Sequence, residues 1–254
     1  MKKKISIILF ALLLAGSNSL MAQQPVTGST DPLVTIEPKV SGFNALKVEG
    51  PVDIVIVQGQ TESLKLTVPA EVKDRIVAKV DGHTLHIRNK HDNWSQGEKS
   101  WYGDKSVWQK KHYRIKAWLT MNILKGISVS GSGTAKFADG IKAEHFDLRL
   151  RGSGSMDGKI DTKSLVTTIS GSGNIKLSGN ANTSRLKVSG SGVFAAPELI
   201  TSSSNVHVSG SGDAKINATE SITAGISGSG NVNYTGTAKN ILTTKSGSGS
   251  ISRF

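Results

Sequence analysis

Residues 188–194 have the sequence VSGSGVF, and residues 208–214 have the similar sequence VSGSGDA. The Gly-Ser-Gly triplet that both contain occurs seven times in the chain of 254 residues, with its first glycine at positions 131, 152, 171, 190, 210, 228 and 247. Successive triplets are 18–21 residues apart. A fixed period of about 20 residues is typical of stacked-repeat architectures, in which one short structural unit recurs along the chain.

Apolar and polar residues alternate on both sides of each triplet, which predicts flanking β-strands. Six of the seven residues two positions before the first glycine are large and aliphatic, and all seven residues four positions after it are apolar. The first set is Val129, Leu150, Ile169, Val188, Val208, Ile226 and the exception Lys245, and the second set is Ala135, Met156, Ile175, Phe194, Ala214, Val232 and Ile251.

One repeat of this length cannot close a core alone, so we expect residues 127–254 to form a parallel β-solenoid of stacked repeats. Equivalent residues would then lie about 4.8 Å apart in continuous inward columns. The glycines would form the corners, where positive φ or close backbone approach excludes a Cβ atom. The serines between them would form a hydroxyl ladder, which corner chemistry explains better than sugar binding. Lys245 fits a terminal rung. An antiparallel sandwich is the main alternative, but it does not require the triplet.

The preceding region, residues 39–126, contains no triplet but also has short alternating segments. Strands are predicted at 45–49, 52–58, 62–68, 76–80 and 84–88, with a hairpin turn at Asp81-Gly82 and a single helical turn within 69–75. This region supplies either the first, irregular rungs of the solenoid or a separate small β-domain. Residues 23–38 are predicted to be a linker that contains prolines.

The first residues have the pattern of a secretory signal peptide. Three lysines at positions 2–4 precede a largely apolar run at 5–15, and small and polar residues follow as far as Ala22. This pattern predicts a signal peptide at 1–22, whose apolar run is too short to span a bilayer comfortably. We therefore expect an exported protein, in the periplasm or at the cell surface, with no transmembrane segment after cleavage. The chain has no cysteine, so neither disulfides nor a cysteine-linked lipid anchor is expected.

The chain is basic, with a formal net charge of +12 that falls to +9 when residues 1–22 and their three lysines are removed. The excess is spread along the chain, whereas nucleic-acid binding proteins concentrate it in a patch. We expect no nucleic-acid partner. A diffuse positive field favours anionic partners such as the phosphates of lipopolysaccharide, acidic glycans or other anionic envelope components. Simple solubility is the alternative explanation.

No catalytic residues, cofactor or metal site is predicted. Strands follow the glycines where a phosphate-binding loop needs a helix, and aspartate does not recur in every turn as a calcium-binding repeat requires. His83 and His86 are closely spaced but fall on opposite sides of a strand. The alternative is a polysaccharide-active enzyme, a lyase or glycosidase, on a β-helix scaffold. It would need paired carboxylates, for which the candidates are Asp139, Asp161, Glu198 and Glu220.

One segment, residues 89–113, interrupts the strand pattern and is rich in aromatic residues and lysines. Its candidate ligand-binding residues are Trp94, Trp101, Tyr102, Trp108 and Tyr113. In the favoured interpretation these rings pack on the open flank of the solenoid and cover its strand edges. In the other interpretation they form an exposed platform that stacks on sugar rings.

Several segments of the first half resemble a known family. These are VSGFN at 40–44, LKVEG at 46–50, VDIVI at 52–56 and DGHTLHI at 81–87. Together with the later Ser-Gly-Ser-Gly rungs, they resemble the head GIN domain family of secreted bacterial proteins, described as putative auto-transporter adhesins, over residues 38–254. The resemblance implies a β-solenoid and export, and it brings no catalytic residues. The leading hypothesis is therefore a non-catalytic, exported protein of the cell envelope with a structural or adhesive role.

Overall fold

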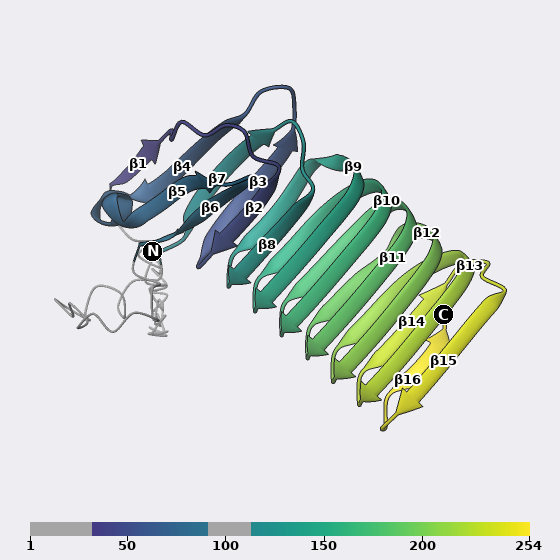
Figure 1. Ribbon diagram of the computed structural model, residues 1–254. Coiled ribbons are helices and arrows are strands. Elements are labelled where there is room, and N and C mark those ends of the chain that lie inside the picture. Colours follow the sequence, from purple (N-terminus) through teal and green to yellow (C-terminus); the bar gives the residue numbers. More distant parts are fainter. Residues whose placement is uncertain (1–31, 91–112) are drawn as a thin grey trace, which may run out of the picture. The chain divides into compact units, whose positions relative to one another are not determined.

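The computed structural model describes residues 32–90 and 113–254, which belong to one compact unit, Asp31–Phe254. Its sixteen strands form one continuous sheet, and the sheet winds into a parallel β-solenoid (Figure 1). Each long strand of the repeats begins after one triplet and ends at the first glycine of the next. These strands are β9 (Thr134–Gly152), β10 (Ser155–Gly171), β11 (Asn174–Gly190), β12 (Val193–Gly210) and β13 (Asp213–Gly228). The predicted fold class is confirmed.

The repeat strands pair in parallel, and their register places equivalent residues in line. Val188 on β11 pairs with Ile169 on β10 and with Val208 on β12. The same column runs from Val129 to Lys245, and its six aliphatic members are at most 3% exposed. Parallel pairing with equivalent partners excludes the antiparallel sandwich for these residues.

The last rungs continue this register. The first half of β13 pairs with β14 (Asn231–Thr235), and its second half pairs with β15 (Asn240–Ser246). β14 pairs in turn with β16 (Ser250–Arg253). Lys245 on β15 is exposed, as expected for a residue on the outermost described rung.

The corner at Gly171 shows why the triplet recurs. Gly171 has φ +111°, and a Cβ atom there would lie 2.6 Å from the carbonyl oxygen of Gly152 on the preceding rung. The backbone N–H of Ser172 donates a hydrogen bond to that same oxygen at 3.0 Å. The Ser172 side chain is exposed. Backbone geometry at the corner is therefore sufficient to explain the glycine.

Five buried polar residues depart from the apolar pattern in the described ranges, and one of them, Thr167, provides a test of packing. Thr167 lies between Leu148 and Leu186 in the register, is 1% exposed, and its hydroxyl has no hydrogen-bond partner. Because an unpaired buried hydroxyl costs free energy, we expect Thr167→Val to stabilise the protein by about 1 kcal/mol. Thermal denaturation checks this, with Thr168→Val, at a half-buried position that faces outward, as the control. A lower melting temperature for Thr167→Val than for the control contradicts the described environment.

The region before the first triplet is continuous with the solenoid. β2 (Ala45–Glu49) pairs in parallel with β8 (Gly126–Gly131), and β3 (Val52–Gln58) pairs in parallel with β9. Gly50 has φ +96°, and its N–H donates to the Ser130 carbonyl oxygen at 2.8 Å. Residues 50–52 thus form an eighth corner without the triplet. Of the two alternatives for this region, the structure supports irregular rungs of the same solenoid.

The order of these first rungs in space differs from their order in sequence. β6 (Thr84–Asn89) pairs in parallel with β2, and β7 (Ile115–Met121) pairs in parallel with β3. The rung made of β6 and β7 therefore lies on the outer side of the β2–β3 rung, although it comes later in the chain. The chain then passes the β2–β3 rung before it begins β8 on that rung's other side.

Antiparallel strands and a short helix cover the end of the solenoid next to β6 and β7. β4 (Ser63–Pro69) pairs with β7, β5 (Ile76–Asp81) pairs with β6, and β1 (Leu33–Ile36) pairs with β4. The 3-10 helix η1 (Ala70–Arg75) connects β4 to β5 and buries Val72.

The five predicted strands and the helical turn of this region are confirmed, each to within one residue. The predicted linker 23–38 is wrong for residues 33–36, which form β1 because they complete the antiparallel edge beside β4. No helix in residues 32–90 or 113–254 combines the length and the apolar character that crossing a membrane needs.

Candidate functional site

Each rung presents two outer surfaces, one on either side of its corner. We call the outward side chains of β6, β2, β8 and the second halves of β9–β13 the pre-corner face. The outward side chains of β7, β3 and the first halves of β9–β13 form the post-corner face. Both faces follow from alternation within each half of a long strand, which directs apolar side chains inward and leaves polar ones outside.

A hollow of about 360 Å³ lies on the pre-corner face, at the end near the antiparallel strands. In β6 the alternation buries Leu85 and Ile87 and turns His86 and Arg88 outward. The hollow is lined by Lys47 and Glu49 from β2, by Val77, Lys79 and Asp81 from β5, and by His86 and Arg88 from β6.

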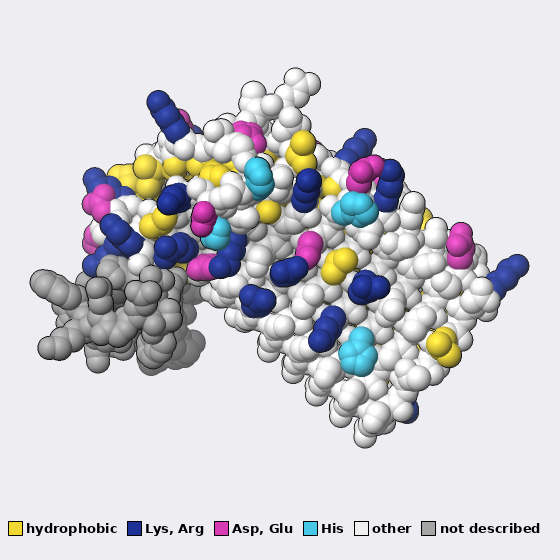
Figure 2. All heavy atoms as spheres, viewed as in Figure 1, with side chains coloured by type: hydrophobic (Ala, Val, Ile, Leu, Met, Phe, Trp, Pro, Cys, Tyr) yellow, Lys and Arg dark blue, Asp and Glu magenta, His cyan; other side chains and the backbone are white. Residues whose placement is uncertain are grey.

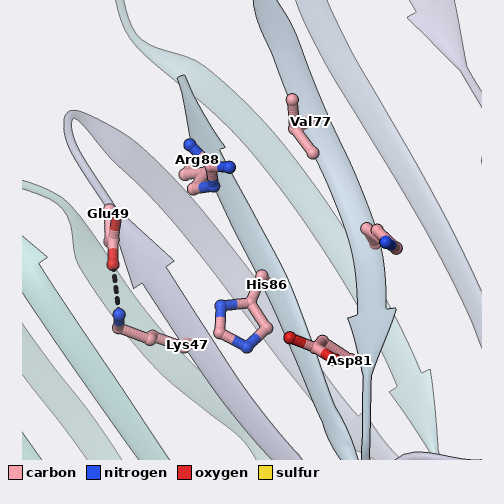
Figure 3. Close-up of a pocket in the computed structure, with 7 residues that line it drawn as sticks. Lys47, Glu49, Val77, Asp81, His86 and Arg88 are labelled. Carbon is pink, nitrogen blue, oxygen red and sulfur yellow. Dashed lines mark ion pairs between the residues drawn. The ribbon is translucent and has the colours of Figure 1, made fainter. Parts of the chain in front are cut away.

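In this hollow the His86 ring lies between Lys47 and Asp81, as Figure 3 shows. Lys47 Nζ and Glu49 Oε1 form an ion pair at 2.5 Å. Three cations, two carboxylates and one imidazole thus share a polar hollow, a combination suited to binding charged or hydroxyl-rich ligands. Residues 32–90 and 113–254 contain no group of three or more His, Asp or Glu side chains that could hold a metal ion.

The carboxylates considered for catalysis lie on different strands. Asp161 on β10 has Lys142 and Asn180 as its cross-strand neighbours, and Glu198 on β12 faces Ser178. Asp139 lies on β9 and Glu220 on β13. The register therefore pairs neither Asp161 nor Glu198 with a second carboxylate of the kind that glycoside hydrolysis needs.

The aromatic segment occupies the place of a corner. β6 ends at Asn89 and β7 begins at Ile115, so the segment joins two strands that a short turn joins in the other rungs. Tyr113 is 6% exposed, and its hydroxyl donates a hydrogen bond to Glu71 Oε2 at 2.7 Å. The Tyr113 ring is therefore packed, and the packing of the rest of the segment stays a prediction. Trp94, Trp101, Tyr102 and Trp108 lie outside the described residues.

An exposed tryptophan on β7 was not among the candidate residues predicted from the sequence. Trp118, on the post-corner face, is 43% exposed, while its neighbours Ala117 and Leu119 are each 1% exposed. Its cross-strand partners are Lys65 on β4 and Val55 on β3. The alternation of apolar and outward-facing residues in IKAWLTM, residues 115–121, is the sequence feature from which this exposure could have been predicted.

Several ion pairs lie on the outer faces and neutralise part of their charge. Arg114 bonds both carboxylate oxygens of Asp53, at 2.9 and 3.1 Å. The hydrogen bond from Lys163, together with its positive charge, lowers the pKa of the Glu144 carboxyl.

Other basic residues have no such partner. Arg151, Arg185 and Lys187 are exposed on the pre-corner face, and none of them forms an ion pair within the described part of the chain. Figure 2 shows basic side chains distributed over the visible surface, as the sequence predicts. The positive charge therefore forms an extended field along the rungs.

These features define a class of protein, a parallel β-solenoid with Gly-Ser-Gly corners and open polar faces. Within that class, the chain belongs to the family described as "Putative auto-transporter adhesin, head GIN domain", whose family model matches residues 42–238. The family suggests a surface or exported protein. Among curated protein sequences, none matches this chain.

Solved structures share the fold. A protein from Bacteroides fragilis NCTC 9343, described as a putative adhesin, is 26% identical with a TM-score of 0.76, over 88% of this chain and 97% of its own. A "Putative lipid binding protein" from Parabacteroides distasonis ATCC 8503 is 23% identical with a TM-score of 0.67, over 89% and 98%. A putative adhesin from Parabacteroides merdae ATCC 43184 is 21% identical with a TM-score of 0.66, over 89% and 98%.

Proposed function

We propose that the protein is a non-catalytic adhesive protein of the cell envelope, exported through its signal peptide, that binds glycans or another anionic surface component. The observation that carries this proposal is the in-register repetition of outward positions along the rungs, with unpaired basic residues such as Arg151, Arg185 and Lys187 among them. An extended polymer or a surface meets many equivalent weak contacts on such an array, and linked weak contacts add to a strong overall interaction.

The comparisons support this proposal at the level of the family, whose description is that of an adhesin. The similar structure from Bacteroides fragilis carries the same description. The Parabacteroides distasonis structure is described as lipid binding, which makes an anionic lipid surface the second ligand to test.

Binding of the purified protein to immobilised acidic polysaccharides, neutral polysaccharides and lipopolysaccharide tests the proposal. We expect retention on an anionic surface, and we expect it to fall as salt is raised from about 0.05 to 0.5 M, because attraction by a diffuse charge field is screened. Protease treatment of intact cells distinguishes surface exposure from a periplasmic location. Absence of retention on all three surfaces at low salt contradicts an adhesive role.

The runner-up, a polysaccharide-active lyase or glycosidase, predicts a chemical product. Incubation with the same polysaccharides, followed by assays for new reducing ends and for unsaturated sugar products, separates the two functions. The adhesive function predicts binding without product. Product formation that is lost in Asp161→Asn or Glu198→Gln would favour the enzyme instead.

The aromatic segment stays a prediction that mutation can resolve. If its rings are packed as the Tyr113 ring is, Trp101→Ala and Trp108→Ala lower the stability of the protein by about 3–5 kcal/mol, as large-to-small substitutions in cores do. If the rings form a binding platform, the same variants melt like the wild-type protein and lose retention on glycans. Melting and retention measured on each variant decide between the two, and no change in either contradicts both.

A further inference from the structure

We propose that the surface around Trp118 binds an acidic polysaccharide. This Trp118 patch consists of Trp118, Val55, Lys65, Lys116 and Lys136, all on the post-corner face or its continuation on β4. The proposal rests on the adhesive function proposed above and names a ligand class and a site for it.

The register places four members of the patch in one row. Lys65 on β4 pairs with Trp118 on β7, Trp118 pairs with Val55 on β3, and Val55 pairs with Lys136 on β9. Since neighbouring strands lie about 4.8 Å apart, the row extends over about 14 Å from Lys65 to Lys136. Lys116 lies two residues from Trp118 along β7, about 7 Å away on the same face. The Trp118 ring thus lies in one row with two lysines, and a third lysine lies near it on the same strand.

The exposure of Trp118 has no explanation in packing. The ring stands 43% exposed on the outer surface, where the fold requires only a β-compatible residue. Tryptophan offers a large, rigid and mostly apolar face, whose negative π-cloud attracts the slightly positive C–H groups of a sugar ring. A sugar stacked on this face would bury apolar surface that is now in contact with water.

The three lysines give the patch its preference for anions. Lys65, Lys116 and Lys136 are exposed, and none of them forms an ion pair with a residue in the described ranges. The neighbouring Arg114 is different, because Asp53 already compensates its charge. Carboxylate or sulfate groups of an extended polymer lying along the row would meet cations on both sides of the stacked sugar. A neutral glycan would use the ring and leave the lysines without partners.

A polymer fits this patch better than a membrane does. The apolar residues of the row are Trp118 and the half-buried Val55, flanked directly by charge. Peripheral membrane binding depends on a broader apolar face that enters the lipid. The row instead has two apolar side chains between two lysines, which matches a sugar chain that carries acidic groups on both sides of a stacked ring.

Binding of the purified full-length protein to polygalacturonate, measured by calorimetry at low salt, tests the proposal. We expect Trp118→Ala to weaken binding about tenfold or more, since buried aromatic anchors carry much of the free energy of an interface. Trp118→Tyr keeps a stacking ring and should retain most of the affinity. The double variant Lys65→Gln/Lys116→Gln should weaken binding by a similar factor and reduce its dependence on salt. Ile200→Ala, which removes a side chain that is 49% exposed on another part of the surface, should bind like the wild-type protein.

Thermal melting of each variant confirms that it is folded before binding is compared. If the wild-type protein binds polygalacturonate and Trp118→Ala binds it equally well, the site is wrong and the adhesive function stands. Equal affinity for neutral dextran, or binding to phosphatidylglycerol vesicles without binding to polygalacturonate, overturns the ligand class. No binding by the wild-type protein to any anionic surface overturns the proposed function itself.

Discussion

Val188→Asp is expected to unfold the protein. Val188 is 0% exposed and lies in the inward column between Ile169 and Val208. An aspartate there has no cationic partner inside the solenoid, because the residues above and below it are aliphatic. An unpaired carboxylate in such a place must either stay charged at high cost or take up a proton, and it leaves polar atoms without hydrogen bonds in both cases. Costs above about 4 kcal/mol are a large fraction of the 5–15 kcal/mol that stabilises a typical domain.

The matched control for this experiment is the adjacent residue. Lys187 also belongs to β11 but points outward, where its cross-strand neighbours are Thr168 and His207. Lys187→Asp introduces the same side chain on the solvent side, so we expect a change within about 0.5 kcal/mol. Circular dichroism and thermal melting of the two variants measure the contrast. Similar melting temperatures would be incompatible with the register of the solenoid.

Much of this register can be predicted from the sequence, because two features of each repeat indicate it independently. The triplet fixes the position of each corner, and the aliphatic residue two positions earlier fixes which side of the strand faces inward. The two signals agree at six of the seven corners, and at the seventh Lys245 is exposed on β15. Local alternation likewise predicts five strands of the first region to within one residue, whereas β1 and β7 were not predicted.

The eighth corner escaped prediction for a physical reason. Gly50 keeps the positive φ that the first glycine of a triplet has, but Pro51 and Val52 replace the serine and second glycine. The second glycine is needed where a carbonyl oxygen of the preceding rung occupies the space that a Cβ atom would take. At Gly133, for example, an added Cβ atom would lie 2.2 Å from the Val52 carbonyl oxygen. Val52 instead faces Ile115 at the start of β7, where the triplet is absent and the long aromatic segment takes the place of the turn.

The candidate sites differ in how far sequence could predict them. Outward exposure of Trp118 follows from alternation within one strand, but Lys65 and Lys136 of its patch come from β4 and β9, which are distant in sequence. The hollow around His86 depends on β2 lying beside β6, and this pairing exists because the β6–β7 rung lies out of sequence order. Long-range pairing of this kind has no local signal in a single sequence.

Gly171→Ala and Ser172→Ala separate the structural role of the triplet from a role of its hydroxyls. At Gly171 an added methyl group meets the Gly152 carbonyl oxygen at 2.6 Å, and the backbone has φ +111°, a conformation that residues with a Cβ rarely adopt. The strained backbone and the clash each cost about 1–3 kcal/mol, so we expect a loss of about 2–6 kcal/mol. The Gly152 oxygen that the methyl group would displace also accepts a hydrogen bond from the Ser172 N–H. The substitution therefore disturbs a backbone hydrogen bond between two rungs.

Ser172→Ala leaves that N–H in place and removes only an exposed hydroxyl, so its stability should change by no more than about 0.5 kcal/mol. Thermal melting of both variants gives the structural comparison, and retention on acidic and neutral polysaccharides gives the functional one. If corner geometry is the reason for the triplet, Gly171→Ala melts well below the wild-type protein while Ser172→Ala melts and binds like it. A combined Ser153→Ala/Ser172→Ala/Ser191→Ala variant that keeps its stability but loses retention would instead assign the row of hydroxyls to ligand binding. The exposed row runs along the corners between the pre-corner and post-corner faces, so this comparison also decides whether a bound polymer can contact the corners or only the faces.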